Sequence, residues 1–172
     1  LMLLHDSRLV GCQLDVINDR MFEEDLSDEE KQKLLKDLKD ISTTSPYHWV
    51  DFYIGRWYKR GWGGEEKKKQ AVVWYTKAGN GGNAAAMFNL AVAYSKGENG
   101  LTQSDTKANE LYALAAEKGH AKARFNLGNN YKNGVGVEID FNRCVELLEQ
   151  CAKQGQVNAQ FNLACIYKDG SL

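Results

Sequence analysis

One pattern recurs four times along this chain, and its regular spacing limits the folds that the chain can adopt. Each copy carries a phenylalanine, and the four phenylalanines are 36, 37 and 36 residues apart. A glycine follows each of them at a constant distance and keeps the same spacing. Several sequence positions that recur with the same period of this length are typical of stacked repeats, rather than of a domain with a single hydrophobic core. The phenylalanines are Phe52, Phe88, Phe125 and Phe161.

Each copy has the pattern of two helices joined by a glycine loop, most clearly over 121–156. Small and apolar residues return every three or four positions, which predicts a first helix from Ala121 that ends before Gly134. Asp140 stands where an N-cap belongs, and Phe141 to Gln154 are predicted to form the second helix. Helices this short are marginal alone in water, so each unit has to bury its faces against its neighbours.

The copies resemble the Sel-like repeat family, a relative of the tetratricopeptide repeats. The third copy carries FNLGNNYKNGVGV followed by Asp140, the second KANELYALAAEKG, and the first QAVVWYTKAG. These match the family pattern A-x-A-x-x-x-L-G-x-x-Y, then G-x-G-V-x-x-D, then an alanine-rich second helix. The sequence departs from it where Ala91 and Ala164 replace the glycine of the first helix. The resemblance implies protein–protein interaction as the function.

The repeats and the resemblance together predict an all-α fold, a right-handed α-solenoid of stacked antiparallel helix pairs. We expect an N-terminal segment, 1–45, followed by the solenoid over 46–172. The solenoid should hold three complete helix pairs and one terminal helix. Its units are predicted to be 46–83, 84–120, 121–156 and, in part, 157–172.

The N-terminal segment is predicted to cap the solenoid with an acidic helix. It holds 11 acidic and 6 basic residues, whereas the remainder of the chain holds 12 and 16. Ser27 and Glu30 form a capping box that opens a helix running to about Ile41. Ser45 followed by Pro46 suits the start of the next helix. An amphipathic helix here would cover the exposed face of the first repeat.

The fourth copy, 157–172, supplies a first helix without its second. Its apolar residues nearly encircle the helix, so an apolar strip that includes Phe161 and Ile166 should remain exposed. We expect further chain or another subunit to cover this end.

No catalytic pattern is present, and the chain is predicted not to be an enzyme. It has no G-x-S-x-G, H-E-x-x-H or C-x-x-C sequence. Its glycine loops follow helices rather than strands and lack the Lys-Ser/Thr of a phosphate-binding loop. We therefore expect no cofactor and no metal. Hydrolase activity, a third option, lacks a nucleophile and base to carry it.

The cysteines and histidines have plain structural interpretations. Cys144 and Cys151 occupy positions at which the other copies have alanine. This predicts that both are small, reduced core residues. This favours a reducing compartment such as the cytoplasm and leaves the location otherwise unassigned. His120 stands at a helix start and is predicted to be a cap rather than a ligand.

The overall charge gives no sign of a nucleic-acid or membrane partner. The formal net charge is −1, and no apolar run approaches the ~18 residues that a membrane span needs. We expect no nucleic-acid binding and no membrane insertion.

The candidate binding residues are the first-helix residues that are not needed for packing. In tetratricopeptide-like stacks the first helices line the concave surface. By analogy, the position of a residue along its first helix indicates whether it faces this surface. The residues chosen in this way include basic residues and no acidic ones. The asparagines among them recur in one register and form a ladder of amides that suits an extended, acidic peptide. The alternative is that they tie each first helix to its own loop. The set is Trp49, Phe52, Tyr53, Arg56, Lys59, Phe88, Asn89, Val92, Lys122, Phe125, Asn126, Asn129, Lys132, Phe161 and Asn162.

Two functions of different classes follow. The first is a non-catalytic scaffold or adaptor that binds a peptide or partner protein, of acidic character, through the concave first-helix surface. The alternative is a structural or regulatory subunit that packs through its ends and convex face in a larger complex. Changing the concave basic residues separates the two, because only the first function depends on them.

Overall fold

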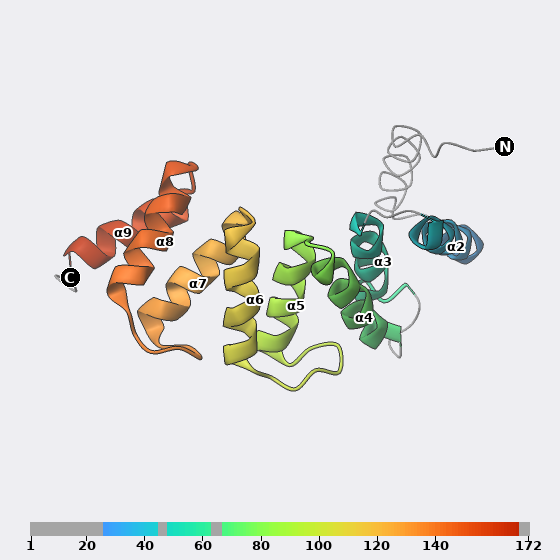
Figure 1. The fold of residues 1–172 in the computed structure, drawn as a ribbon, viewed down its shortest axis with the longest axis horizontal. Helices are drawn as coiled ribbons and strands as arrows, with labels where there is room; N and C mark the ends of the chain where they lie inside the picture. The colour runs from blue at the N-terminus through green and yellow to red at the C-terminus, as the bar shows by residue number, and fades with distance from the viewer. Residues whose placement is uncertain (1–25, 45–47, 63–66, 169–172) are drawn as a thin grey trace.

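The structure is a computed structural model that describes residues 26–44, 48–62 and 67–168. These residues form eight helices and no strand. Figure 1 shows the helices side by side in a row, with α2 at one end and α9 at the other. The helices are α2 (Asp28–Thr44), α3 (Trp49–Lys59), α4 (Lys68–Asn80), α5 (Ala84–Lys96), α6 (Asp105–Glu117), α7 (Ala121–Asn133), α8 (Phe141–Lys153) and α9 (Val157–Lys168).

The helices pack in consecutive pairs, as the repeat pattern predicts. The closest packing joins α3 to α4, α5 to α6, and α7 to α8, and each pair then packs against the next. Among the described helices, α3 and α5 are the one pair in substantial contact that is not consecutive in sequence. The predicted all-α solenoid, three helix pairs followed by a terminal helix, is confirmed.

Side chains cap the starts of α5, α6, α7 and α8. Asn83, Ser104, His120 and Asp140 each accept a hydrogen bond from the backbone N–H three residues later, at 2.9, 3.4, 3.1 and 3.0 Å. Such a cap satisfies a donor that the helix itself cannot. The predicted capping roles of His120 and Asp140 are confirmed. Helix α7 ends at Gly134, whose φ of 69° is a conformation that glycine adopts without strain.

Small side chains hold the second helices close to their neighbours. Two positions of each second helix carry alanine or cysteine and have no exposed surface. Burial raises the pKa of the Cys144 and Cys151 thiols, which makes them poor nucleophiles. Both cysteines are free, so the prediction of small core residues is confirmed. The six residues are Ala71, Ala78, Ala108, Ala115, Cys144 and Cys151.

Helix α2 is fixed to the first helix pair by apolar contacts and by one buried carboxylate. Leu34 and Leu38 are buried in the core cluster that α3 and α4 also supply. Asp51 of α3 is only 2% exposed and accepts hydrogen bonds from Ser42 Oγ at 2.6 Å and Lys77 Nζ at 2.8 Å. A buried carboxylate needs such partners. These bonds join α2, α3 and α4.

Helix α2 begins where the sequence predicts, but it ends later than predicted. The capping box is confirmed: Ser27 N–H donates to Glu30 Oε2 at 3.0 Å, and Glu30 N–H donates to Ser27 Oγ at 3.3 Å. The helix continues past Ile41 to Thr44. Thr44 Oγ1 donates to the Asp40 carbonyl at 3.1 Å, which satisfies an acceptor in the last turn.

Some expectations fall on residues that the structure does not describe. They are the N-terminal segment before residue 26, the break at Ser45 and Pro46, and the glycine loop at 63–66.

The exposed surface of α9 differs in part from the expectation. Phe161 is 68% exposed, as expected, whereas Ile166 is 1% exposed. Ile166 lies in the core cluster with Leu148, because α9 turns this face towards α8. The expectation that Ile166 belongs to the exposed strip was wrong. The exposed large apolar residues of α9 are Val157, Phe161 and Tyr167.

Candidate partner-binding surface

The four first helices, α3, α5, α7 and α9, form the first-helix surface. Hydrogen bonds join α3 to α5 and α7 to α9, and side chains of α5, α7 and α9 line one hollow. All fifteen predicted binding residues lie on these helices, and none of them is buried. Lys59, Lys122 and Phe161 are exposed, and the other twelve are half-buried.

Aromatic side chains at the α3 end of the first-helix surface pack mainly against one another. The Phe52 ring centre lies 5.6 Å from that of Tyr53 and 6.0 Å from that of Tyr75. Trp49 lies 6.1 Å from Tyr53, and the Arg56 guanidinium 5.8 Å from the Phe52 ring centre. These residues also pack against the first core cluster. Only the edges of these rings that remain exposed are open to a partner.

Some asparagines of the predicted set form hydrogen bonds between neighbouring repeats, whereas Asn126 does not. Lys59 Nζ donates to Asn89 Oδ1 at 2.9 Å, and Asn162 Nδ2 donates to Asn129 Oδ1 at 2.9 Å. These two bonds link neighbouring repeats, so Asn89 and Asn162 are partly engaged within the chain. Asn126 forms no side-chain hydrogen bond with any described residue and lines the hollow between α5, α7 and α9.

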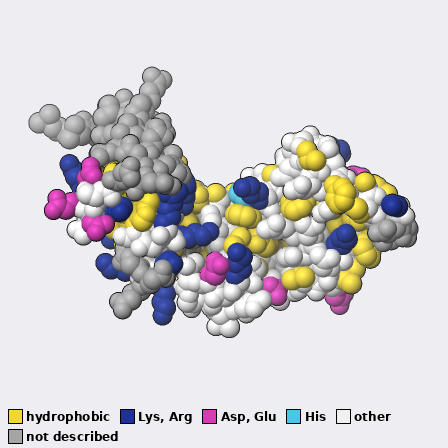
Figure 2. Space-filling view, turned by 180° about the vertical axis from the view of Figure 1, so that it is seen from behind, with side chains coloured by type: hydrophobic (Ala, Val, Ile, Leu, Met, Phe, Trp, Pro, Cys, Tyr) yellow, Lys and Arg dark blue, Asp and Glu magenta, His cyan; other side chains and the backbone are white. Residues whose placement is uncertain are grey.

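This hollow has a volume of about 420 Å³. Its walls combine apolar rings with amide groups, and its one charged lining residue is Lys122. On the face shown in Figure 2, Lys and Arg side chains lie among hydrophobic ones. Rings, amides and a cation together suit a peptide that carries a carboxylate. The lining residues are Phe88, Lys122, Phe125, Asn126, Gln156, Val157 and Asn158.

One wall of the hollow is fixed by a ring stack between two repeats. The Phe88 ring of α5 stacks on His120, with ring centres 4.6 Å apart. His120 Nδ1 accepts the N–H of Ala123, which requires that this nitrogen carry no proton. Burial, together with the charge of Lys122, lowers the pKa of His120 and so favours the accepting form.

The rest of the described chain offers little for other chemistry. No three His, Cys, Asp or Glu side chains in the described ranges come together as a metal ion would need. None of the described helices combines the length and apolar character of a membrane span.

The family can now be assigned from the repeats themselves. The model of the Sel1 repeat matches residues 52–83, 84–120, 121–156 and 157–172, which is more than half of the chain. The chain belongs to the Sel1 repeat family. The matched segments follow the helix pairs, with α9 as the start of the fourth Sel1 repeat.

Curated relatives of this Sel1 repeat chain are much longer proteins. It is 36% identical over 85 residues to the ERAD-associated E3 ubiquitin-protein ligase component HRD3 of Candida glabrata, over 49% of this chain and 10% of the relative. It is 38% identical over 91 residues to chitin synthase regulatory factor 1 of Schizosaccharomyces pombe, over 52% of this chain and 20% of the relative. The matched parts are thus a fifth or less of each relative.

Solved structures show the same fold. A Sel1 repeat protein from Oxalobacter formigenes has a TM-score of 0.70 and 26% identity, over 80% of this chain and 56% of that one. A protective antigen of uropathogenic Escherichia coli with this fold has a TM-score of 0.72 and 26% identity, over 80% of this chain and 29% of that one.

Three residues of the hollow, Gln156, Val157 and Asn158, lie outside the predicted binding set. Gln156 and Val157 occupy the positions that His120 and Ala121 hold one repeat earlier. The stack of Phe88 on His120 shows why this position matters, because it brings the start of α7 against the phenylalanine of the preceding repeat. The spacing of the repeats carries no signal for that contact.

Proposed function

We propose that this Sel1 repeat chain is a non-catalytic scaffold whose first-helix surface binds an acidic, extended peptide segment of a partner protein. The hollow between α5, α7 and α9 is the observation that carries the proposal. It sets the exposed ammonium of Lys122 beside the amides of Asn126 and Asn158, between apolar walls. The amides suit the peptide backbone, and the ammonium suits an acidic side chain or a terminal carboxylate.

The charges and the relatives support the same conclusion. The predicted binding set contains Arg56, Lys59, Lys122 and Lys132 and no acidic residue. Proteins similar to parts of this chain are named as a ligase component and as a regulatory factor, names that suit a protein which acts through its partners.

The proposal is tested with a short fluorescein-labelled peptide that is rich in Asp and Glu and has a free C-terminal carboxylate. We expect its affinity, measured by fluorescence anisotropy, to fall between low and moderate salt because exposed charges are screened. Lys122→Glu should weaken binding roughly tenfold, because an attraction of up to about 1 kcal/mol becomes a repulsion. Asn126→Ala should weaken it severalfold through the loss of one hydrogen bond.

Lys153→Glu is the matched control, because Lys153 is also exposed but lies in the last turn of the second helix α8. It should bind the peptide as the parent does. An affinity that does not change with salt, or that Asn126→Ala leaves intact, contradicts the proposal.

A second candidate function is favoured by the apolar surface of α9. Ala164 occupies the position of Gly128 and Ala91, which are buried beneath the second helices of their own pairs, but Ala164 is exposed. This face suits a further helix that packs as α8 packs on α7, as in a subunit of a larger complex. Assembly of that kind should survive Lys122→Glu, which separates the two candidates.

A further inference from the structure

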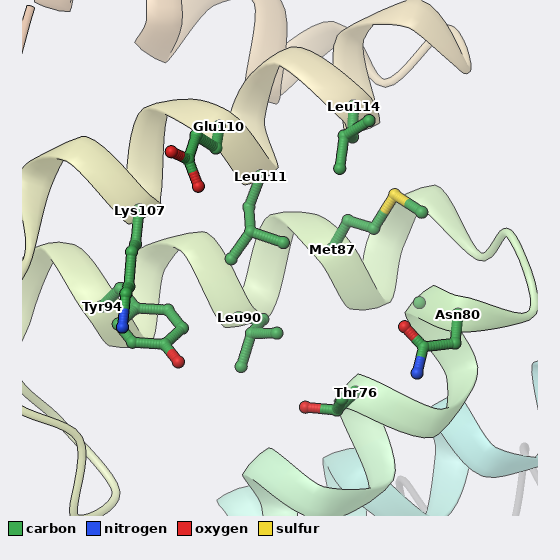
Figure 3. Close-up of a pocket in the computed structure, with 10 residues that line it drawn as sticks. Thr76, Asn80, Met87, Leu90, Tyr94, Lys107, Glu110, Leu111 and Leu114 are labelled. Atoms are coloured by element: carbon green, nitrogen blue, oxygen red, sulfur yellow. The ribbon is translucent and has the colours of Figure 1, made fainter.

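A second cavity lies on the opposite side of α5, between α4 and α6. We call it the second-helix groove, and its volume is about 300 Å³. Figure 3 shows Met87 and Leu90 on α5 at its floor, with Leu111 and Leu114 on the α6 wall. None of the residues that line it belongs to the predicted binding set. The groove is therefore distinct from the first-helix surface.

The next repeat shows which side chain occupies the position that corresponds to Met87. Met87 corresponds to Arg124, which is 8% exposed. The Arg124 guanidinium donates to the Ala116 carbonyl and to Gln154 Oε1, both at 3.1 Å. In that repeat the chain's own side chain therefore packs between the second helices α6 and α8 and satisfies polar groups there.

In the second-helix groove the corresponding residues are less polar. Met87 has no donor with which to copy the bonds of Arg124, and Leu114 stands where the next repeat has Gln150. Leu114 is 46% exposed, one of the large apolar side chains left open to solvent. Met87 is itself only 8% exposed, as Arg124 is, so the apolar surface that the groove leaves open comes mainly from Leu114. An open apolar concavity favours an apolar side chain from another molecule.

Charges at the rim indicate the character of that molecule. Lys107 and Glu110 lie one turn apart on α6, and both are exposed. Lys107 Nζ lies 5.5 Å from the centre of the Tyr94 ring. Glu110 forms no ion pair with any described residue, so its carboxylate is open to a basic group. A helix that carries both an apolar face and a basic residue matches this edge.

We propose that the second-helix groove docks an amphipathic helix of a partner protein. A leucine of that helix enters the space above Met87 and between Leu111 and Leu114. A lysine or arginine one turn away pairs with Glu110. The arrangement is a knob set into a hole of surrounding side chains, with α4 and α6 as the two walls.

The methionine methyl groups make the test direct, because the chain has three methionines. Methionine-labelled protein is titrated with a synthetic amphipathic helical peptide that carries leucines on one face and lysines at its edge. We expect the Met87 methyl resonance to shift in a saturable way. A peptide with serine in place of the leucines should leave it unchanged.

A reciprocal pair of variants supplies the control. Met87→Arg fills the groove as the next repeat does and should weaken peptide binding about tenfold or more, because the leucine loses its buried site. Arg124→Met should open the equivalent groove and raise the stoichiometry towards two peptides. Thermal unfolding checks that both variants fold, and Lys122→Glu should leave this binding unchanged.

Two results overturn the proposal. One is a folded Met87→Arg variant that binds the leucine peptide as tightly as the parent. The other is a Met87 methyl resonance that moves with protein concentration alone, before any peptide is added, which would make a second copy of the chain the occupant.

Discussion

Replacing Leu127 with alanine is expected to lower the free energy of unfolding by about 2–5 kcal/mol. Leu127 is 5% exposed in the middle core cluster, where it packs with Ala108 and Tyr112 of the preceding second helix. The truncation leaves a cavity between two repeats, and helices this short cannot replace the lost packing from within themselves. Chemical denaturation followed by circular dichroism measures the change.

Leu114→Ala is the matched comparison, because Leu114 is also a helical leucine but is 46% exposed. Leu114→Ala should lower the free energy of unfolding by much less than Leu127→Ala, because Leu114 contributes less buried apolar surface. Equal effects of the two substitutions would show that the repeat register, and with it the assignment of buried positions, is wrong.

Gly55→Ala should lower the free energy of unfolding by about 1–3 kcal/mol, although alanine is the better helix former. A Cβ at Gly55 would lie 2.6 Å from the Tyr75 ring, and Tyr75 is 1% exposed. The ring cannot retreat into solvent, so α3 and α4 have to move apart. The shift in the denaturation midpoint is the measurement.

Gly79→Ala provides the control in α4. The added methyl would lie 3.4 Å from Met87 Cγ, which is ordinary contact, and the next repeat has Ala116 at this position. Helix propensity should make this variant equal to the parent or slightly more stable. A Gly55→Ala variant that is as stable as Gly79→Ala would contradict the close crossing of α3 and α4.

The fold was predictable because each repeat supplies independent evidence for the next. Alanine in two copies predicted the buried setting of Cys144, and the position of Asp140 before an apolar run predicted its cap. These inferences depend only on local spacing and on helix geometry.

The side-chain arrangement was less predictable, because it depends on how neighbouring helices turn towards each other. Asn89 and Asn162 are bonded across repeats, which register alone does not specify. Ile166 faces α8, although the residues of α9 are apolar nearly all round. The second-helix groove is lined by Met87 where the next repeat has Arg124, and the repeat spacing alone does not reveal a cavity there.

The most direct test of the central claim is to locate the bound acidic peptide on the chain by nuclear magnetic resonance. Backbone and side-chain amide shifts are mapped during a titration at low salt. We predict that the shifts concentrate on α5, α7 and α9, and that they include the side-chain amides of Asn126 and Asn158. Shifts confined to α4, α6 and α8, or no shifts at the highest peptide concentration, would contradict a binding role for the first-helix surface.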